Sequence, residues 1–241
     1  MKTIILCGGK GTRAHPVTVD VPKALIEVGG KPILRHVMDV YASQGFREFV
    51  LAAGHKADLI EEFSRTMPAE LTVDAVDTGE DTQTGERVTR CRDRITDPFF
   101  LTYADGLANV DLARLLSFHR AHGGAATVTV VPLPSPYGTI ETGGDGVVTT
   151  FTEKPVLADH NINGGYFVMD QRVFDCWAGT DLEREVLPNL VEARELYAYQ
   201  HTGFWKSLDT YKDALTLSAL TSEGREEKTT PWLRFETPAS S

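Results

Sequence analysis

The chain has 241 residues, of which 41% are hydrophobic and 24% are charged, and its formal net charge is −10. This composition is typical of a globular protein with a sizeable core, and the acidic balance argues against a nucleic-acid partner, because such binding needs clustered Lys and Arg. Cys7, Cys91 and Cys176 are too few and too widely spaced to predict a disulfide framework or a zinc cluster. Apolar runs stay well short of the roughly 20 residues that a membrane span needs, so we expect a cytoplasmic protein without membrane contact.

Strand and helix signals alternate through the first half of the chain. Apolar runs predict strands at 3–6, 48–54, 71–78, 98–106 and 125–133, and helical periodicity predicts helices at 31–45, 57–67 and 109–124. This order predicts an α/β domain whose mixed, mainly parallel sheet is covered by helices on both faces.

The pattern changes after about residue 135. It predicts a polar hairpin at 137–155, a strand at 161–170, a helix at 181–194 that is broken near Pro188, strand-rich chain at 195–210 and a helix at 210–220. A polar tail then follows at 221–241, in which Trp232 and Phe235 are candidates for docking onto the domain.

A glycine-rich loop, "GGKGTR", begins at Gly8 directly after the first strand. Glycines allow positive φ and close approach of the backbone, and successive N–H groups in such a turn bind anions. The Walker pattern is absent, and the Rossmann pattern is matched formally by Gly9, Gly11 and Ala14, although Pro16 and β-branched residues disfavour the helix which that pattern requires. We therefore expect a phosphate loop, and an NAD-dependent oxidoreductase stays open as an alternative.

Two cations and a carboxylate suit the same phosphate chemistry. Arg13 offers a rigid fork of donors for phosphate oxygens, and Lys23 is a point charge that follows a proline. Asp105 ends an apolar strand, at the sheet edge where α/β proteins bind ligands. Asp209, in "SLDT", is either a second carboxylate of this site or the N-cap of the helix that follows.

The loop "GGKGTR" with "PK" some ten residues later resembles the signature of sugar-1-phosphate nucleotidyltransferases. "TYADG", "FTEKP" and "INGGYFV" follow in the order of that family. "VDTGEDTQTGERVTR", "GGKPILRHVM" and "HTGFWKSLDT" resemble glucose-1-phosphate cytidylyltransferases in particular. The resemblance extends to about residue 220.

The resemblance implies a Rossmann-like, GT-A-like three-layer domain over 1–220, with a nucleotide-binding half at about 1–130, a sugar-binding half at about 131–220 and a C-terminal tail at 221–241. It implies an Mg²⁺-dependent enzyme that joins a nucleoside triphosphate to a sugar 1-phosphate and releases pyrophosphate. CTP and glucose 1-phosphate are the leading pair, and a homo-oligomer is expected.

The resemblance also assigns the site residues. The catalytic residues are Arg13 and Lys23. The nucleotide-binding residues are Leu6, Gly8, Gly9, Gly11, Thr12, Arg13, Thr84, Gly85, Arg87 and Asp105. The sugar-phosphate-binding residues are Gly138, Glu153, Lys154, Asn163 and Gly164. The metal ligands are Asp105 and Asp209. Thr84, Gly85 and Arg87 would form a lid on the base side, and a mobile connection or an oligomer contact is the alternative for that loop.

The chain departs from the cytidylyltransferase pattern mainly on the sugar side. Ala24 stands where that pattern usually has a proline, and Ala104 where it usually has a glycine. "PYGTIE" stands where the pattern has a run of the Arg-Phe-Gly-Ala type. Another base, or a heptose or cyclitol 1-phosphate, therefore stays open. A sugar-nucleotide sensor without catalytic activity is a further alternative on the same fold.

Overall fold

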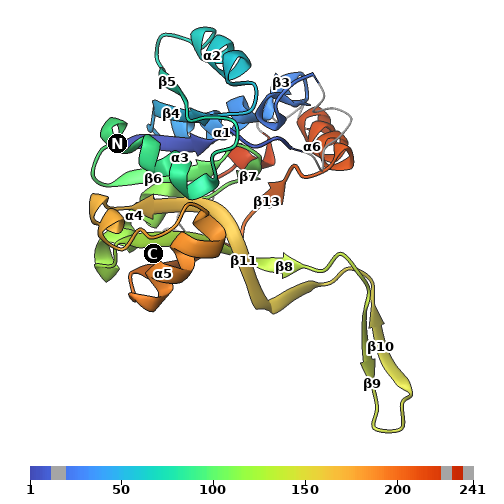
Figure 1. The fold of residues 1–241 in the computed structure, drawn as a ribbon. Helices are drawn as coiled ribbons and strands as arrows, with labels where there is room; N and C mark the ends of the chain where they lie inside the picture. The colour runs from blue at the N-terminus through green and yellow to red at the C-terminus, as the bar shows by residue number, and fades with distance from the viewer. Residues whose placement is uncertain (12–19, 224–229, 236–241) are drawn as a thin grey trace, which may run out of the picture.

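A seven-stranded sheet in the spatial order β12-β8-β11-β6-β1-β4-β5 forms the centre of the molecule (Figure 1). The computed structural model describes residues 1–11, 20–223 and 230–235. The strands of this sheet are β1 (Lys2–Leu6), β4 (Glu48–Ala53), β5 (Thr72–Asp77), β6 (Phe99–Tyr103), β8 (Ala126–Pro134), β11 (Val156–Met169) and β12 (Leu196–Gln200). β11 pairs antiparallel with β6 and β8, and the remaining pairs are parallel. The mixed, mainly parallel sheet predicted from the sequence is confirmed.

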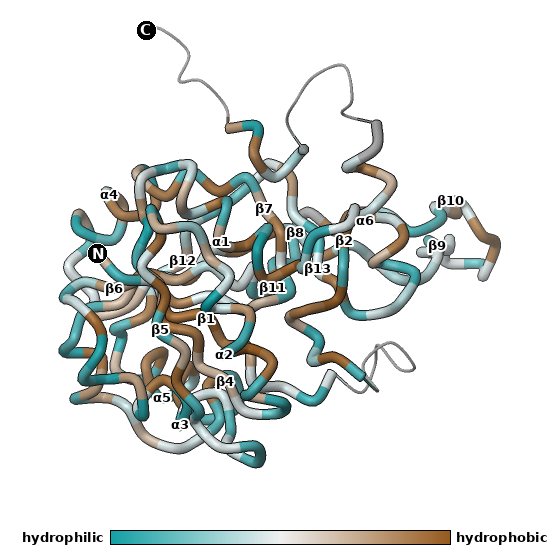
Figure 2. The backbone as a smooth tube through the Cα atoms, turned by 90° about the horizontal axis from the view of Figure 1, so that it is seen from above, coloured by the Kyte–Doolittle hydropathy of each residue, from teal (hydrophilic) through white to brown (hydrophobic). Residues whose placement is uncertain are grey.

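Helices cover both faces of this sheet. They are α1 (Ile33–Ser43), α2 (Ala57–Arg65), α3 (Thr84–Arg90), α4 (Leu112–His122), α5 (Leu187–Glu192) and α6 (Tyr211–Glu223). Successive side chains of a strand point to opposite faces, so Ile5 of β1 packs into a core with α1, α2, α4 and α6, while Ile4 and Leu6 pack into a second core with α3 and α5. Hydrophobic residues accordingly gather along β1 and β4 inside the molecule (Figure 2). The predicted three-layer fold follows from these two cores.

Short helical turns complete the chain. They are the 3-10 turns η3 (Lys23–Leu25), η4 (Arg92–Arg94), η5 (Gln171–Asp175) and η7 (Pro231–Leu233), and the π-helical turn η6 (Leu182–Val186). The helix predicted at 181–194 is divided into η6 and α5, and Pro188 lies at the start of α5, where a missing N–H costs nothing.

Among the α-helices that the structure describes, α3 is the one that the sequence patterns did not predict. Its residues include Gly85 and the β-branched Thr84, Val88 and Thr89, which have low helix propensity. Tertiary packing provides the stability, because Val88 and the adjacent Cys91 are fully buried against the sheet.

Three two-stranded sheets flank the central one: β2 (Glu27–Val28) with β3 (Lys31–Pro32), β7 (Gly106–Ala108) with β13 (Trp205–Ser207), and β9 (Thr139–Thr142) with β10 (Val148–Thr152). The β7–β13 pair continues in a hydrogen bond of 2.8 Å from the Leu208 N–H to the Asp105 carbonyl, which brings Asp209 beside Asp105. The β9–β10 hairpin, in contrast, extends away from the body of the molecule (Figure 1).

Trp232 joins the end of the described chain to the core. It lies on η7, is fully buried, and packs edge-on against the His36 ring at 5.2 Å between ring centres. Phe235 packs against the same core. Both aromatic residues of the tail therefore dock, as the sequence allowed. Among the described helices, none combines the length and the apolar character that crossing a membrane requires.

Candidate active site

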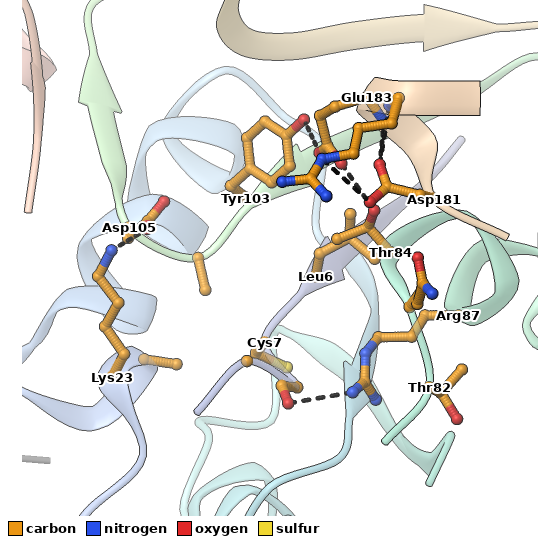
Figure 3. Close-up of a pocket in the computed structure, with 16 residues that line it drawn as sticks. Leu6, Cys7, Lys23, Thr82, Thr84, Arg87, Tyr103, Asp105, Asp181 and Glu183 are labelled. Carbon is orange, nitrogen blue, oxygen red and sulfur yellow. Dashed lines mark hydrogen bonds and ion pairs between the residues drawn. The ribbon is translucent and has the colours of Figure 1, made fainter. Parts of the chain in front are cut away.

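A cavity of about 530 Å³ opens at the carboxyl ends of β1 and β6, the edge where parallel sheets bind ligands. Its walls come from the glycine loop after β1, from η3, from the end of β6, from α3 and from η6 (Figure 3). The volume lies within the usual range of small-molecule sites, about 300–1,000 Å³. We refer to it as the first cavity.

A second cavity of about 280 Å³ adjoins the first one. Tyr103 and Asp105 line both, so the two cavities meet at the end of β6. The other walls of the second cavity come from the glycine pair of β11, including Gly164, and from the segment that follows β13, including Asp209. One carboxylate, Asp105, is thus accessible from two adjoining compartments.

Lys23 lies between two carboxylates at this junction. Its ammonium Nζ is 2.5 Å from Asp105 Oδ2 and 3.1 Å from Asp209 Oδ1. Pro22 holds the chain extended just before η3, which directs Lys23 towards the end of β6 (Figure 3). Since one ammonium contacts both carboxylates, their oxygens converge on a single point.

This pair of carboxylates fits Mg²⁺. Magnesium prefers hard oxygen ligands, is typically held by one or two carboxylates, and takes water and phosphate oxygens as its other ligands. Within residues 1–11, 20–223 and 230–235, His, Cys, Asp and Glu do not gather into a metal site of three or more ligands.

Neighbouring side chains fix the position of the Asp209 carboxylate. The Ser207 hydroxyl donates to Asp209 Oδ2 at 2.8 Å. The first turn of α6 is capped by Thr210 and Asp213: the Asp213 carboxylate accepts from the Thr210 N–H at 2.9 Å, and the Thr210 hydroxyl accepts from the Asp213 N–H at 3.3 Å. This capping box favours the interpretation of Asp209 as a site carboxylate over a helix cap.

Tyr103 forms the partition between the two cavities. Its hydroxyl donates to Glu183 Oε1 at 2.5 Å and accepts from the Asn163 amide at 3.2 Å. Burial raises the pKa of the Tyr103 phenol far above its ordinary value, so the hydroxyl stays a neutral donor. The Thr84 hydroxyl donates to Glu183 Oε2 at 2.7 Å, which ties α3 to η6. The Glu183 carboxylate is thereby fixed at the wall of the first cavity.

Most of the nucleotide-side and metal residues expected from the sequence lie together. The first cavity is lined by Leu6, Gly8, Gly9, Lys23, Thr84, Arg87 and Asp105, and the second by Asp105, Asn163, Gly164 and Asp209. Thr12 and Arg13 lie outside the described residues, and Gly11 is described but is not part of the cavity walls.

Two residues of the expected base-side lid are packed closely within the protein. A Cβ on Gly85 would lie 2.8 Å from the Thr180 carbonyl oxygen, so this glycine allows α3 to pack against the chain before η6. The Arg87 side chain points inward and is only 4% exposed. It donates five hydrogen bonds, to four backbone carbonyls and to the Thr78 hydroxyl.

Three residues expected at the sugar phosphate lie outside both cavities. Gly138, Glu153 and Lys154 are on the projecting hairpin and line neither cavity. The Glu153 and Lys154 side chains are 63% and 62% exposed and lie 3.9 Å apart. A Cβ on Gly138 would lie 2.8 Å from the Phe151 ring, so this glycine allows the two strands of the hairpin to pack.

The sequence reasoning missed Tyr103, Asp181 and Glu183. A signal existed for Tyr103, since it is the last residue of β6, at the carboxyl end of a strand where α/β sheets bind ligands. Asp181 and Glu183 belong to no recognisable motif. They lie about 80 residues after Tyr103 in the sequence, and only the fold places them beside it.

Comparisons with known proteins identify the family of the chain. Residues 2–223 match the family model described as nucleotidyl transferase. The chain is 41% identical to a probable glucose-1-phosphate cytidylyltransferase of Bacillus subtilis, over 94% of this chain and 98% of the relative. It is 35% identical to a glucose-1-phosphate cytidylyltransferase of Salmonella typhimurium, over 98% and 100%.

A solved structure shows the same fold. It is titled a putative glucose-1-phosphate thymidylyltransferase from Bacillus anthracis in complex with a sucrose, and it superposes with a TM-score of 0.72 at 19% identity, over 98% of this chain and 100% of that one. The resemblance drawn from the glycine loop and the motifs after it is confirmed by these matches: the chain belongs to the nucleotidyl transferase family.

Proposed function

We propose that this enzyme transfers a nucleotidyl group from a nucleoside triphosphate to a sugar 1-phosphate, with CTP and glucose 1-phosphate as the preferred pair. The observation that carries the proposal is the meeting of two cavities at Asp105, with Lys23 and Asp209 on the same point. The first cavity takes the nucleotide and the second takes the sugar phosphate. The reacting phosphates then meet at the junction.

The reaction needs positioning and charge neutralisation more than covalent catalysis. An oxygen of the sugar phosphate attacks the α-phosphorus of the triphosphate in line. The bond from the α-phosphorus to the bridging oxygen breaks, and pyrophosphate leaves with the electron pair. Lys23 neutralises charge on the phosphates, and the Gly8–Gly9 backbone lies against the nucleotide.

Asp105 and Asp209 are the residues that would hold Mg²⁺. When bound, the ion supplies a Lewis acid that neutralises phosphate charge and aligns the reacting groups. Lys23 is already placed at the carboxylate pair, so it can contact a phosphate that binds there without a large movement of the chain.

The choice of CTP has two supports. One is the similarity to relatives that are named cytidylyltransferases. The other is the Glu183 carboxylate at the wall of the first cavity, whose oxygens accept hydrogen bonds. Such an acceptor suits a base with an exocyclic amine, which cytosine shares with adenine and guanine, and disfavours uracil and thymine. The sugar is supported by the named relatives alone.

A substrate matrix tests this proposal. Four nucleoside triphosphates are combined with glucose, mannose, heptose and cyclitol 1-phosphates, and pyrophosphate release is measured with and without Mg²⁺. We expect the highest kcat/KM for CTP with glucose 1-phosphate, and turnover only with Mg²⁺. A preference for another pair corrects the substrates. Saturable nucleotide binding with no turnover for any pair contradicts catalysis and favours a sensor.

We also propose that the enzyme is a homo-oligomer of the cytoplasm. Three unpaired cysteines suit a reducing compartment. The β9–β10 hairpin supports assembly, because Tyr137, Ile140, Phe151 and Val156 are 57–77% exposed on and beside it. An isolated two-stranded hairpin is only marginally stable in water, so a second copy of the chain that covers these side chains would stabilise it.

Phe151→Lys tests the assembly. Phe151 pairs with Ile140 across the hairpin, whereas Thr150, on the other face, pairs with Glu141. We expect Phe151→Lys to lower the molar mass measured by light scattering at micromolar concentration, because a charge in the apolar patch opposes its burial. The matched control, Thr150→Lys, should keep the wild-type mass. A monomeric wild type, or an unchanged mass for Phe151→Lys, contradicts the role of the hairpin.

A further inference from the structure

Arg87 joins the ends of three neighbouring parallel strands. Its Nη1 donates to the Ala53 carbonyl at 2.9 Å, to the Thr78 hydroxyl at 2.6 Å and to the Gly79 carbonyl at 2.8 Å, and its Nη2 donates to the Gly8 and Glu80 carbonyls at 3.1 Å each. These acceptors lie at or just after the ends of β4, β5 and β1. The guanidinium therefore fixes the sheet edge on which the first cavity opens (Figure 3).

The charge of this guanidinium is buried without an ion pair. All five acceptors are neutral oxygens, and among the residues that the structure describes, no carboxylate lies within 4.0 Å of Arg87. Burial lowers the pKa of Arg87 from its ordinary value, yet a guanidinium remains protonated in proteins. A positive charge thus lies directly behind the glycine loop.

Gly8 and Gly54 leave room for the Arg87 side chain. A Cβ on either glycine would overlap the Arg87 guanidinium. Neither glycine has positive φ, so backbone conformation does not require a glycine at these positions. The absence of their side chains makes the space that the guanidinium fills.

The hydrogen bond to Gly8 also sets the direction of the next N–H. The Gly8–Gly9 peptide is trans and planar, so its C=O and its N–H point in opposite directions. The Gly8 carbonyl accepts from Arg87 and from the His55 N–H at 3.1 Å each. The Gly9 N–H must then face away from Arg87, and within the described residues it meets no acceptor. Gly9 lines the first cavity, so this donor is open to a ligand there.

We propose that Arg87 is a positioning residue for the phosphates of the nucleotide: it holds the Gly8–Gly9 peptide with its N–H towards the first cavity and places a buried positive charge behind that peptide. This inference rests on the proposed function, because the ligand it serves is a nucleoside triphosphate. Arg87 acts through the glycine loop and does not itself contact the reacting atoms.

Arg87→Lys is the direct test, with CTP and cytidine as the two probes in calorimetry without sugar phosphate. A lysine keeps the charge but cannot bridge three strand ends. We expect the Kd of CTP to rise about tenfold, the effect of losing one charge-assisted, oriented contact, while the Kd of cytidine changes less than about twofold.

Arg90→Lys is the matched control. Arg90 lies on the same helix and donates to the Thr78 carbonyl at 2.6 Å, but it is half exposed and makes no contact with Gly8. It should leave the Kd of CTP unchanged. Gly8→Ala is a second variant, because its Cβ displaces the guanidinium. Gly8→Ala should raise the Kd of CTP as Arg87→Lys does. The effects of the two substitutions on the binding free energy of CTP should be less than additive in the double variant.

Several results would overturn the inference. Unchanged CTP affinity in Arg87→Lys, an equal loss for CTP and cytidine, or full additivity with Gly8→Ala would each do so. Loss of folding in both variants would do so as well, since Arg87 would then be needed for the fold rather than for the ligand. Because these arms measure binding, they remain decisive even if the substrate matrix shows no turnover.

Discussion

Asp105→Asn will reduce pyrophosphate release by at least about 10²–10³-fold at saturating substrates, the usual cost of removing one preorganised electrostatic contact. The substitution keeps the shape of the side chain and removes the charge that both Lys23 and Mg²⁺ require. The fold should survive, because the Asp105 side chain is 29% exposed and its backbone is held by the β7–β13 region through Leu208. Turnover over a range of Mg²⁺ concentrations and the thermal unfolding midpoint are the two measurements.

Asp74→Asn provides the comparison for this experiment. Asp74 also forms an ion pair of 2.5 Å on a strand, with Arg94, but it lines neither cavity. The Asp74→Asn variant should release pyrophosphate at the wild-type rate. Near-normal turnover of Asp105→Asn at low Mg²⁺ would mean that Asp105 is not a metal ligand.

The central sheet could be predicted because its determinants are local. In β1, Ile4, Ile5 and Leu6 are all apolar, which requires cover on both faces, and the helices of the βα units provide that cover. The glycine loop, Lys23 and Asp105 could also be predicted as one site, since the ends of parallel strands meet at one edge.

The direction of the Arg87 side chain could not be predicted in the same way. Its position in the "TGER" motif indicates importance but not whether the guanidinium faces a ligand or the protein. That outcome depends on the carbonyls of Gly8, Ala53 and Gly79, which belong to three separate strand ends. Three-dimensional proximity of this kind has no local sequence signal.

The position of the β9–β10 hairpin relative to the cavities could not be predicted from the sequence either. Alternation and turn residues predicted its two strands, but its distance from the cavities depends on how far β8 and β11 extend beyond the sheet. Glu153 and Lys154 therefore have the residue types that suit a sugar phosphate and lie outside both cavities of their own chain. The Phe151→Lys experiment tests whether this hairpin takes part in the proposed assembly.

Lys23→Met separates two proposed roles of Lys23, which are to occupy the carboxylate pair and to neutralise charge on the phosphates. As the ammonium contacts both Asp105 and Asp209, it occupies the point where the carboxylate oxygens converge and would compete with a divalent cation bound in the proposed metal site. Removing it should tighten Mn²⁺ binding in the absence of nucleotide by about tenfold, equivalent to about 1.4 kcal/mol. Turnover should nevertheless fall by about 10²–10³-fold, because the phosphates lose a positioned charge.

These opposite changes distinguish Lys23 from a lysine that only stabilises the fold. Calorimetry with Mn²⁺ and pyrophosphate release measure the two effects on the same preparation. Lys31→Met is the control, since Lys31 forms an ion pair of 2.6 Å with Asp39 away from both cavities and should change neither quantity. If Lys23→Met binds Mn²⁺ no more tightly than the wild type, the carboxylates do not form the metal site. If it also keeps its turnover, the junction is not where the phosphates react.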